Sequence, residues 1–297
     1  MRMLRSRRRG PASLWALGLG LASAMVLFPA GCRRARDEPL TCHVGGTMRP
    51  VMQELARIHQ KETGVKVEIN SAGSGELLAH IESHKAGDLY VCHDPFLDML
   101  MQKFHLGVDG WTVAELTPVI VVQKGNPKKI RGLKDLVPAS VELWLTDYEK
   151  STLGHMLKTI FAKAGIDFDK LNEDKTIPTH KGGAHVATLV QTRNADAALC
   201  WNAVAHLRRK DLDIIPLPAE HLPTPGVDTV TSATGKAYTL TPVRVTIATL
   251  KCSRRLDDAK KFAEFVASDR AAKVFQEFGF TQIGVKKEYD NGRALKP

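Results

Sequence analysis

The feature that most constrains the fold is a regular alternation of strand-like and helix-like segments. Residues 40–44, 65–69 and 88–91 are short apolar runs typical of buried strands. Residues 48–63 and 76–83 lie between them and have apolar residues at helical spacing. Such alternation predicts a parallel sheet covered by helices, with ligands bound at the carboxyl ends of the strands.

A second unit of the same kind follows along the chain. Its predicted strands are residues 143–145, 177 and 197–201, and its predicted helices are residues 153–164 and 184–191. Two further strands, residues 119–123 and 244–250, connect the units, and a helix pair over residues 257–278 would cover the first one.

The chain is therefore predicted to leave a first lobe, build a second lobe and return. We expect a two-lobed α/β fold in which each lobe is a mixed, mostly parallel sheet flanked by helices, joined by a double hinge. The expected boundaries are residues 40–118 and 243–297 for lobe 1, and residues 119–242 for lobe 2.

The first 31 residues have the order of an export signal, with a basic start and an apolar run over residues 14–28. This run is shorter than the roughly 20 residues that a spanning helix needs. The small residues before Cys32 resemble a bacterial lipobox, in which the cysteine is lipidated, although Pro29 stands where Leu is usual. Ordinary cleavage and an uncleaved anchor remain open, as does Sec or twin-arginine export. Residues 32–39 would form a tether, and the mature chain would be periplasmic or otherwise extracytoplasmic.

The net charge of +10 does not indicate a nucleic-acid partner. Eight arginines and no acidic residue fall within residues 1–36, which leaves 34 Lys and Arg against 32 Asp and Glu in the rest of the chain. The folded part is thus nearly neutral, whereas nucleic-acid binding needs a basic surface.

Four turns carry the residues of greatest interest. Thr47 and Ser74 follow adjacent predicted strands and begin helices, and matching turns in the second unit contain Ser151, Thr152, Leu153 and Gly183. Free N–H groups and the positive end of a helix can hold an anion at such turns. The alternative is plain capping, since Ser and Thr are favoured N-cap residues.

The chemistry of these turns favours one kind of anion. A fully deprotonated tetrahedral dianion only accepts hydrogen bonds, whereas hydrogen phosphate also needs an acceptor. None of the four turns has Asp or Glu at its tip, and no cationic side chain is needed. We therefore expect a molybdate-like ion rather than phosphate.

Several motifs together resemble a known family. They are Gly45-Gly46-Thr47-Met48, Ser74-Gly75-Glu76-Leu77, Ser151-Thr152-Leu153-Gly154, Ala195-Asp196-Ala197-Ala198-Leu199-Cys200-Trp201 and Phe278-Gly279-Phe280. Their order is similar to that in the molybdate and tungstate solute-binding proteins of ABC transporters, which are type II periplasmic binding proteins. The resemblance covers residues 40–280.

The resemblance implies the roles of particular residues. The hydroxyl groups of Thr47 and Ser74 would bind the oxyanion, together with main-chain N–H groups near Thr152 or Leu153 and near Gly183. Trp201 stands where the molybdate proteins usually have a Tyr, and Ser151 appears where tungstate-type proteins have a carboxylate. The implied partner is an ABC permease, with no cofactor, no nucleic acid and a monomeric state.

Two other classes of function stay open. A transition-metal receptor would use His43, Cys92 and His93, with His155 and His185 nearby, because imidazole and thiolate are common metal ligands. In the oxyanion interpretation, a protonated His93 or His155 would instead add positive charge. An enzyme on the same fold has no motif in its favour, since GxSxG, HExxH and GxxxxGK are all absent.

The remaining cysteines do not indicate a disulfide framework. Cys42, Cys92, Cys200 and Cys252 lie in apolar runs without CxxC spacing, as small core residues do. A single bridge between Cys42 and Cys92 is the one pairing left open.

Overall fold

The computed structural model describes residues 38–296, apart from residues 149–150, 181, 226, 232–236 and 240–242. The predicted export signal, the lipidation site Cys32 and most of the predicted tether lie outside the described residues.

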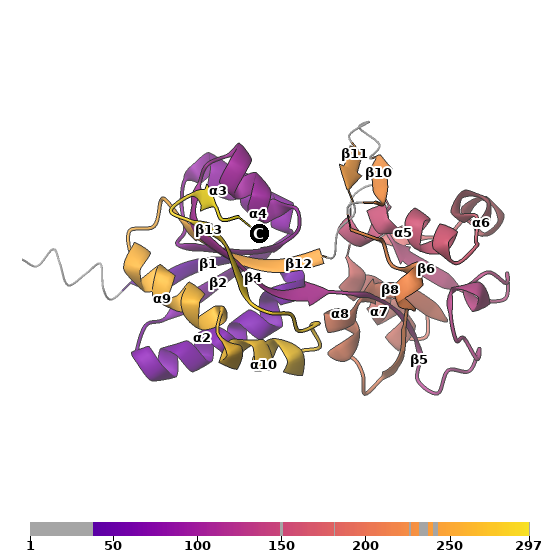
Figure 1. The fold of residues 1–297 in the computed structure, drawn as a ribbon. Coiled ribbons are helices and arrows are strands. Elements are labelled where there is room, and N and C mark those ends of the chain that lie inside the picture. Colours follow the sequence, from indigo (N-terminus) through magenta and orange to yellow (C-terminus); the bar gives the residue numbers. More distant parts are fainter. Residues whose placement is uncertain are drawn as a thin grey trace, which may run out of the picture.

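The first lobe is built on a seven-stranded sheet with the order β14-β13-β4-β12-β3-β1-β2. Its strands are β1 (Leu40–Gly45), β2 (Val67–Ala72), β3 (Leu89–His93), β4 (Gly107–Leu116), β12 (Val243–Leu250), β13 (Lys286–Asp290) and β14 (Arg293–Ala294). The helical segments are η1 (Gly46–Met48), α2 (Arg49–Thr63), α3 (Ser74–His84), α4 (Phe96–Asp98), η2 (Met99–Lys103), α9 (Leu256–Val266) and α10 (Asp269–Glu277). Figure 1 shows α2, α9 and α10 together on one face of this sheet, with α3 and α4 on the other.

The second lobe is built on a five-stranded sheet with the order β7-β6-β8-β5-β9. Its strands are β5 (Pro118–Gln123), β6 (Leu143–Thr146), β7 (Thr179–His180), β8 (Ala197–Trp201) and β9 (Leu212–Pro216). Its helical segments are η3 (Leu133–Leu136), α5 (Thr152–Lys163), α6 (Phe168–Lys175), α7 (Gly183–Gln191), α8 (Asn202–His206) and η4 (Ala219–His221), and a short ribbon pairs β10 (Thr229–Thr231) with β11 (Ala237–Thr239). The two sheets give the α/β fold with two lobes that the sequence predicts (Figure 1).

Both sheets are mixed, but they contain less parallel pairing than expected. Parallel pairing is confined to β2-β1-β3 and β7-β6-β8, and the other described pairs within the two sheets are antiparallel. The description "mostly parallel" is therefore wrong for the first sheet. Apart from β9, the strands that extend each sheet come from the connections between lobes and from the C-terminal segment.

One short strand lies two residues beyond its predicted position. Residue 177 is buried but not in a strand, and β7 pairs through Thr179 and His180 with Leu145 and Thr146. Pro178 separates the two positions; its carbonyl accepts from the Leu145 N–H at 3.2 Å, but it has no N–H of its own to donate.

The parallel register places the predicted turns at one sheet edge. Gly45 at the end of β1 lies opposite Ala72 at the end of β2. The turns that contain Thr47 and Ser74 follow directly, so the prediction that they meet at the same edge is confirmed.

A small polar cluster holds the chain where it passes from β4 to β5. Thr117 lies between the two strands, and its N–H donates to the side-chain oxygen of Asn202 at 3.1 Å. The Asn202 amide donates to the hydroxyl of Thr281 at 3.0 Å, and that hydroxyl lies 2.8 Å from the Thr117 hydroxyl. The return crossing, between β11 and β12, runs through residues 240–242, which lie outside the described residues.

The start of α5 is packed closely against the loop after β6. Ser151 is the N-cap: its hydroxyl accepts from the Gly154 N–H at 2.8 Å and donates to the Asp147 carbonyl at 2.9 Å. A Cβ atom on Gly154 would overlap that same carbonyl. Gly154 is thus required by close approach rather than by an unusual φ angle.

Gly154→Ala is expected to lower the free energy of unfolding by about 1–3 kcal/mol, the usual cost of overpacking. Gly183→Ala is the matched control, because a Cβ there would make an ordinary contact of 3.5 Å with the Cys200 Cβ. Thermal unfolding of the two variants checks the difference. Equal melting temperatures would show that the loop before α5 moves aside without cost.

Candidate functional site

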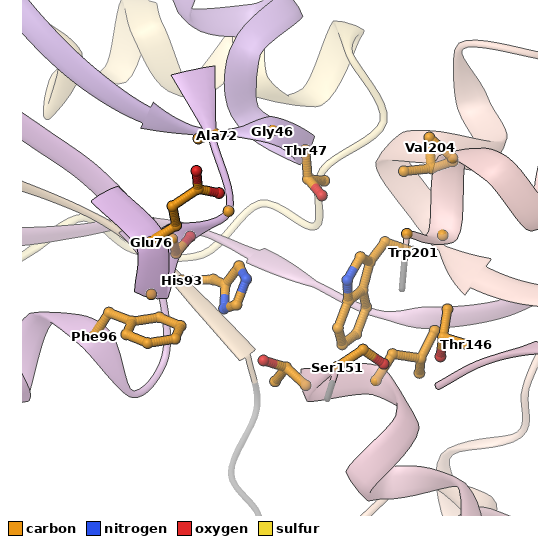
Figure 2. A pocket seen from close by; sticks show the side chains of 18 of the residues that line it. Gly46, Thr47, Ala72, Glu76, His93, Phe96, Thr146, Ser151, Trp201 and Val204 are labelled. Carbon is orange, nitrogen blue, oxygen red and sulfur yellow. The ribbon is translucent and has the colours of Figure 1, made fainter. Parts of the chain in front are cut away.

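A cavity of about 610 Å³ lies between the two lobes. It is lined by Gly46, Thr47, Pro50, Ala72, Gly73, Ser74, Gly75, Glu76, His93 and Phe96 from the first lobe, and by Thr146, Ser151, Thr152, Leu153, Gly182, Gly183, Ala184, Trp201, Val204, Leu207 and Arg208 from the second. Figure 2 shows side chains of both lobes directed toward this space.

All seven residues that the sequence singled out as ligand-binding lie on this one cavity. Thr47 and Ser74 come from the first lobe, and Ser151, Thr152, Leu153, Gly183 and Trp201 come from the second. Six of them sit at the starts of helical segments and Trp201 ends a strand. The topology therefore brings together residues that are more than 150 positions apart in sequence.

Ser74 is the most informative of these residues. It is the first residue of α3, whose N-cap is Gly73, and no side chain caps this helix. Ser74 is 5% exposed, and within the part of the chain that the structure describes its Oγ has no hydrogen-bond partner. Gly45 leaves the space for it, because a Cβ at Gly45 would overlap this oxygen. Plain capping therefore does not explain Ser74.

Thr146 is the corresponding residue of the second lobe, and sequence reasoning missed it. It ends β6, is 2% exposed, and its Oγ1 also has no hydrogen-bond partner among the described residues. A buried hydroxyl group without a partner costs roughly 1–3 kcal/mol. Its place at the carboxyl end of a parallel strand is the one sequence signal that indicates a ligand.

The helix starts around the cavity supply main-chain donors. The first-turn N–H groups of α3, α5 and α7 have no acceptor within their own helices. They include those of Ser74 and Gly75, of Thr152 and Leu153, and of Gly183. Each such turn also has the positive end of the helix dipole, so an anion would be stabilised here.

Ser151 has a different role from the one implied by its turn. Its hydroxyl hydrogen is donated to the Asp147 carbonyl, and its N–H also donates to that carbonyl at 3.0 Å. Both of its donors are thus engaged. Ser151 lines the cavity but holds the start of α5 in place.

Trp201 and His93 approach the cavity from opposite lobes. Figure 2 shows the indole ring and the imidazole ring facing each other across it. Trp201 ends β8 and is followed by Asn202 of the polar cluster at the crossing. His93 ends β3 and is followed by Asp94, whose carboxylate accepts from the Arg244 guanidinium at 2.7 and 2.9 Å. Both rings are therefore fixed next to the connections between lobes.

Burial favours the uncharged form of His93. Its Nδ1 lies 2.9 Å from the Asp94 carbonyl, and a carbonyl can only accept, so Nδ1 carries the hydrogen. The pKa of His93 is lowered mainly by burial, although the carbonyl and the charge of Asp94 oppose this. In the uncharged ring, Nε2 is left as an acceptor. Burial thus opposes the expected protonation of His93.

Two charged side chains that sequence reasoning passed over also line the cavity. Glu76 is in the first turn of α3, and its Oε2 lies 3.9 Å from the position of a Cβ on Gly73, so the carboxylate turns back over the start of the helix. Arg208 follows α8, and its guanidinium donates to the Val204 carbonyl at 3.1 Å. The cavity thus contains an acidic and a cationic side chain in addition to the residues of the four turns.

The metal-binding alternative finds no support in the arrangement of its residues. Within the part of the chain that the structure describes, no three or more His, Cys, Asp or Glu residues are placed to hold a metal ion. His43 lies away from the cavity, 3.1 Å from both the Ala86 carbonyl and the Asn70 amide. The Cys92 thiol lies 3.2 Å from the Thr246 hydroxyl, and burial raises its pKa to about 12.

The cysteines themselves are unpaired core residues. Cys42, Cys92 and Cys200 are buried and Cys252 is half-buried, all as free thiols. The interpretation as small core residues is confirmed, and the bridge between Cys42 and Cys92 is not formed.

Two mixed sheets thus enclose one cavity that is lined from both lobes. A family model described as "Bacterial extracellular solute-binding protein" matches residues 40–281, and this chain belongs to that family. By that description, its members are solute-binding proteins. The extracellular description fits the predicted location outside the cytoplasmic membrane, and the described residues contain no helix long and apolar enough to cross one.

Individual relatives and structures agree with this assignment. The chain is 23% identical to a Haemophilus influenzae protein named "Putative binding protein", over 81% of this chain and 90% of the relative. It is 25% identical to the Bacillus subtilis "Putative ABC transporter substrate-binding lipoprotein YvgL", over 88% of this chain and 95% of the relative.

Solved structures share the fold at low identity. The periplasmic molybdate-binding protein of Azotobacter vinelandii superimposes with a TM-score of 0.66 at 13% identity, covering 82% of this chain and 99% of that one. The sulfate-binding protein SubI of Mycobacterium tuberculosis superimposes with a TM-score of 0.62 at 19% identity, covering 82% and 87%. The fold is thus shared by receptors for different solutes.

Ser74→Ala is expected to leave the melting temperature of the ligand-free protein unchanged or slightly raised, because it removes a buried hydroxyl group without a partner. Ser151→Ala is the comparison, and it should cost about 1 kcal/mol because it removes a working N-cap. Thermal unfolding measures both. If Ser74→Ala loses as much stability as Ser151→Ala, Ser74 acts as a helix cap.

Proposed function

We propose that this protein is the receptor of an ABC importer and that it binds a tetrahedral oxyanion between its two lobes. The observation that carries the proposal is the pair of buried hydroxyl groups without partners, Ser74 in one lobe and Thr146 in the other, on a single cavity. An oxyanion with four acceptor oxygens can accept from both at once. Helix starts in both lobes supply further donors, at Thr47, Thr152, Leu153 and Gly183.

Molybdate and tungstate are the ions that the family resemblance favours, and one of the structural neighbours is named for molybdate. Sulfate and phosphate are the alternatives, and another neighbour is named for sulfate. The sequence argument for molybdate over phosphate was the lack of an acid at the turns. Glu76 lines the cavity and could accept the hydrogen of hydrogen phosphate, so that argument no longer holds. The geometry of the cavity therefore does not favour molybdate over phosphate.

Binding between lobes also explains how the ligand would be carried and released. Closure about the connection at Thr117 and the predicted return connection before β12 would bring donors from both lobes onto the anion. The closed form would then dock on the permease as a monomer. We propose that the domains follow the predicted boundaries, residues 40–118 with 243–297 and residues 119–242.

We further propose that a lipid on Cys32 holds the protein at the outer face of the cytoplasmic membrane. The order of residues before Cys32 supports this, as does the word lipoprotein in the name of the Bacillus subtilis relative. Such an anchor would keep the receptor near its permease.

Ser74→Ala and Thr146→Val are each expected to weaken oxyanion binding by roughly tenfold to a hundredfold, since a hydrogen bond to a charged group contributes about 1.5–3 kcal/mol. Titration calorimetry with molybdate, tungstate, sulfate and phosphate measures the effect. Ser83→Ala is the matched control, because Ser83 is an exposed residue of α3 away from the cavity.

The same four ions should raise the melting temperature of the wild-type protein according to their affinities, by mass action. An absence of any shift at millimolar concentration, together with a shift by a divalent transition metal, would contradict the oxyanion proposal and favour the metal-binding alternative.

Cys32→Ser is expected to move the protein from the membrane fraction to the soluble fraction, because a few arginines give only weak and salt-sensitive attachment. Immunoblots of salt-washed membranes check this. Retention of Cys32→Ser would mean that the export signal stays uncleaved as an anchor.

A further inference from the structure

The cavity wall contains acceptors as well as donors. Glu76 and the Nε2 atom of His93 both belong to the first lobe and both accept hydrogen bonds. A ligand with acceptor oxygens alone would satisfy the donors and leave these two groups without a hydrogen. Their presence therefore bears on which oxyanion the site selects.

A possible donor for His93 lies across the cavity in the second lobe. Figure 2 shows the indole of Trp201 opposite its ring, and the indole nitrogen is only a donor. When the lobes close, the Trp201 N–H can satisfy Nε2 of His93. This pair needs nothing from the ligand.

Glu76 has no such donor beside it. It makes no salt bridge or side-chain hydrogen bond with any described residue, and its side chain is exposed at the cavity. Its carboxylate turns back toward Gly73, at the helix start where Ser74 presents its unpartnered hydroxyl group. Ser74 and Glu76 both belong to the first turn of α3 and both line the cavity, so an oxyanion bound at this helix start would share a wall of the cavity with the carboxylate.

The Glu76 carboxylate would distinguish two classes of tetrahedral oxyanion. Sulfate, molybdate and tungstate carry no hydrogen at neutral pH, so the carboxylate would repel them without a compensating hydrogen bond. Hydrogen phosphate carries one hydrogen, and a phosphate monoester with a hydroxyl group also brings one. We propose, resting on the proposed function, that the ligand belongs to the phosphate class and that Glu76 accepts its hydrogen.

Arg208 provides the main rival explanation for Glu76. It lies across the cavity in the second lobe, and an ion pair with Glu76 could form when the lobes close. Such a pair would affect every ligand alike, whereas a hydrogen bond from the ligand affects only the ions that carry a hydrogen. The two explanations therefore differ in selectivity rather than in affinity alone.

The experiment is calorimetric titration of wild type, Glu76→Gln and Glu82→Gln with phosphate, arsenate, sulfate and molybdate at mildly alkaline pH. Phosphate and sulfate are close in size but differ in carrying a hydrogen, while molybdate is larger and arsenate carries a hydrogen as phosphate does. Glu82 is an exposed acid of the same helix that does not line the cavity, so Glu82→Gln controls for the loss of one charge.

We expect wild type to bind phosphate and arsenate at least about tenfold more tightly than sulfate and molybdate. Glu76→Gln should remove that preference, by weakening phosphate and leaving sulfate unchanged or tighter, and Glu82→Gln should match wild type. Sulfate or molybdate binding as tightly as phosphate would overturn the inference and leave the oxyanion receptor standing. Equal weakening of all four ions in Glu76→Gln would also overturn it, in favour of the pair with Arg208. If no anion binds any variant, the proposed function itself fails.

Discussion

Two buried hydroxyl groups without partners, Ser74 and Thr146, are the constraint on which this account depends. Leaving such groups unpaired costs roughly 1–3 kcal/mol each, and proteins seldom retain them without a compensating interaction. Both residues line one cavity from opposite lobes, and the proposed ligand would pair both hydroxyl groups. The rest of the architecture keeps them there. The parallel register of β1 and β2 places the start of α3 at the sheet edge, and Gly45 leaves room for the Ser74 side chain.

The same architecture explains why a nearly neutral protein can attract an anion. First-turn N–H groups and helix dipoles from both lobes supply positive potential without a cluster of basic side chains. Main-chain donors are fixed in direction, so they select for the geometry of the oxyanion. The Glu76 carboxylate selects for an oxyanion that carries a hydrogen. Arg208 adds one cation at the wall of the second lobe. Affinity and selectivity thus come from different groups, and release requires only that the lobes separate.

Much of the fold could be predicted because its signals are local. The alternation from β1 to β3, the helices α5 and α7, and the turns with Thr47 and Ser74 all follow from periodicity and from Gly, Ser and Thr at helix starts. The antiparallel strands β4, β9 and β13 pair with segments that are distant in sequence. For example, β4 pairs with β12 and β13, and no local sequence pattern specifies such partners. The residues that line the cavity could be predicted only in part. Turn residues could be found, but Thr146 and Arg208 look like an ordinary strand end and an ordinary surface base until the fold brings them to the cavity.

The position of the anion is the most direct test of the central claim. Anomalous diffraction from a crystal grown with an oxyanion whose central atom scatters anomalously, such as arsenate or tungstate, would locate that atom. The account predicts one peak between the lobes, with oxygens of the ion within about 3 Å of both Ser74 Oγ and Thr146 Oγ1. A well-occupied peak that leaves both hydroxyl groups without a partner would contradict it.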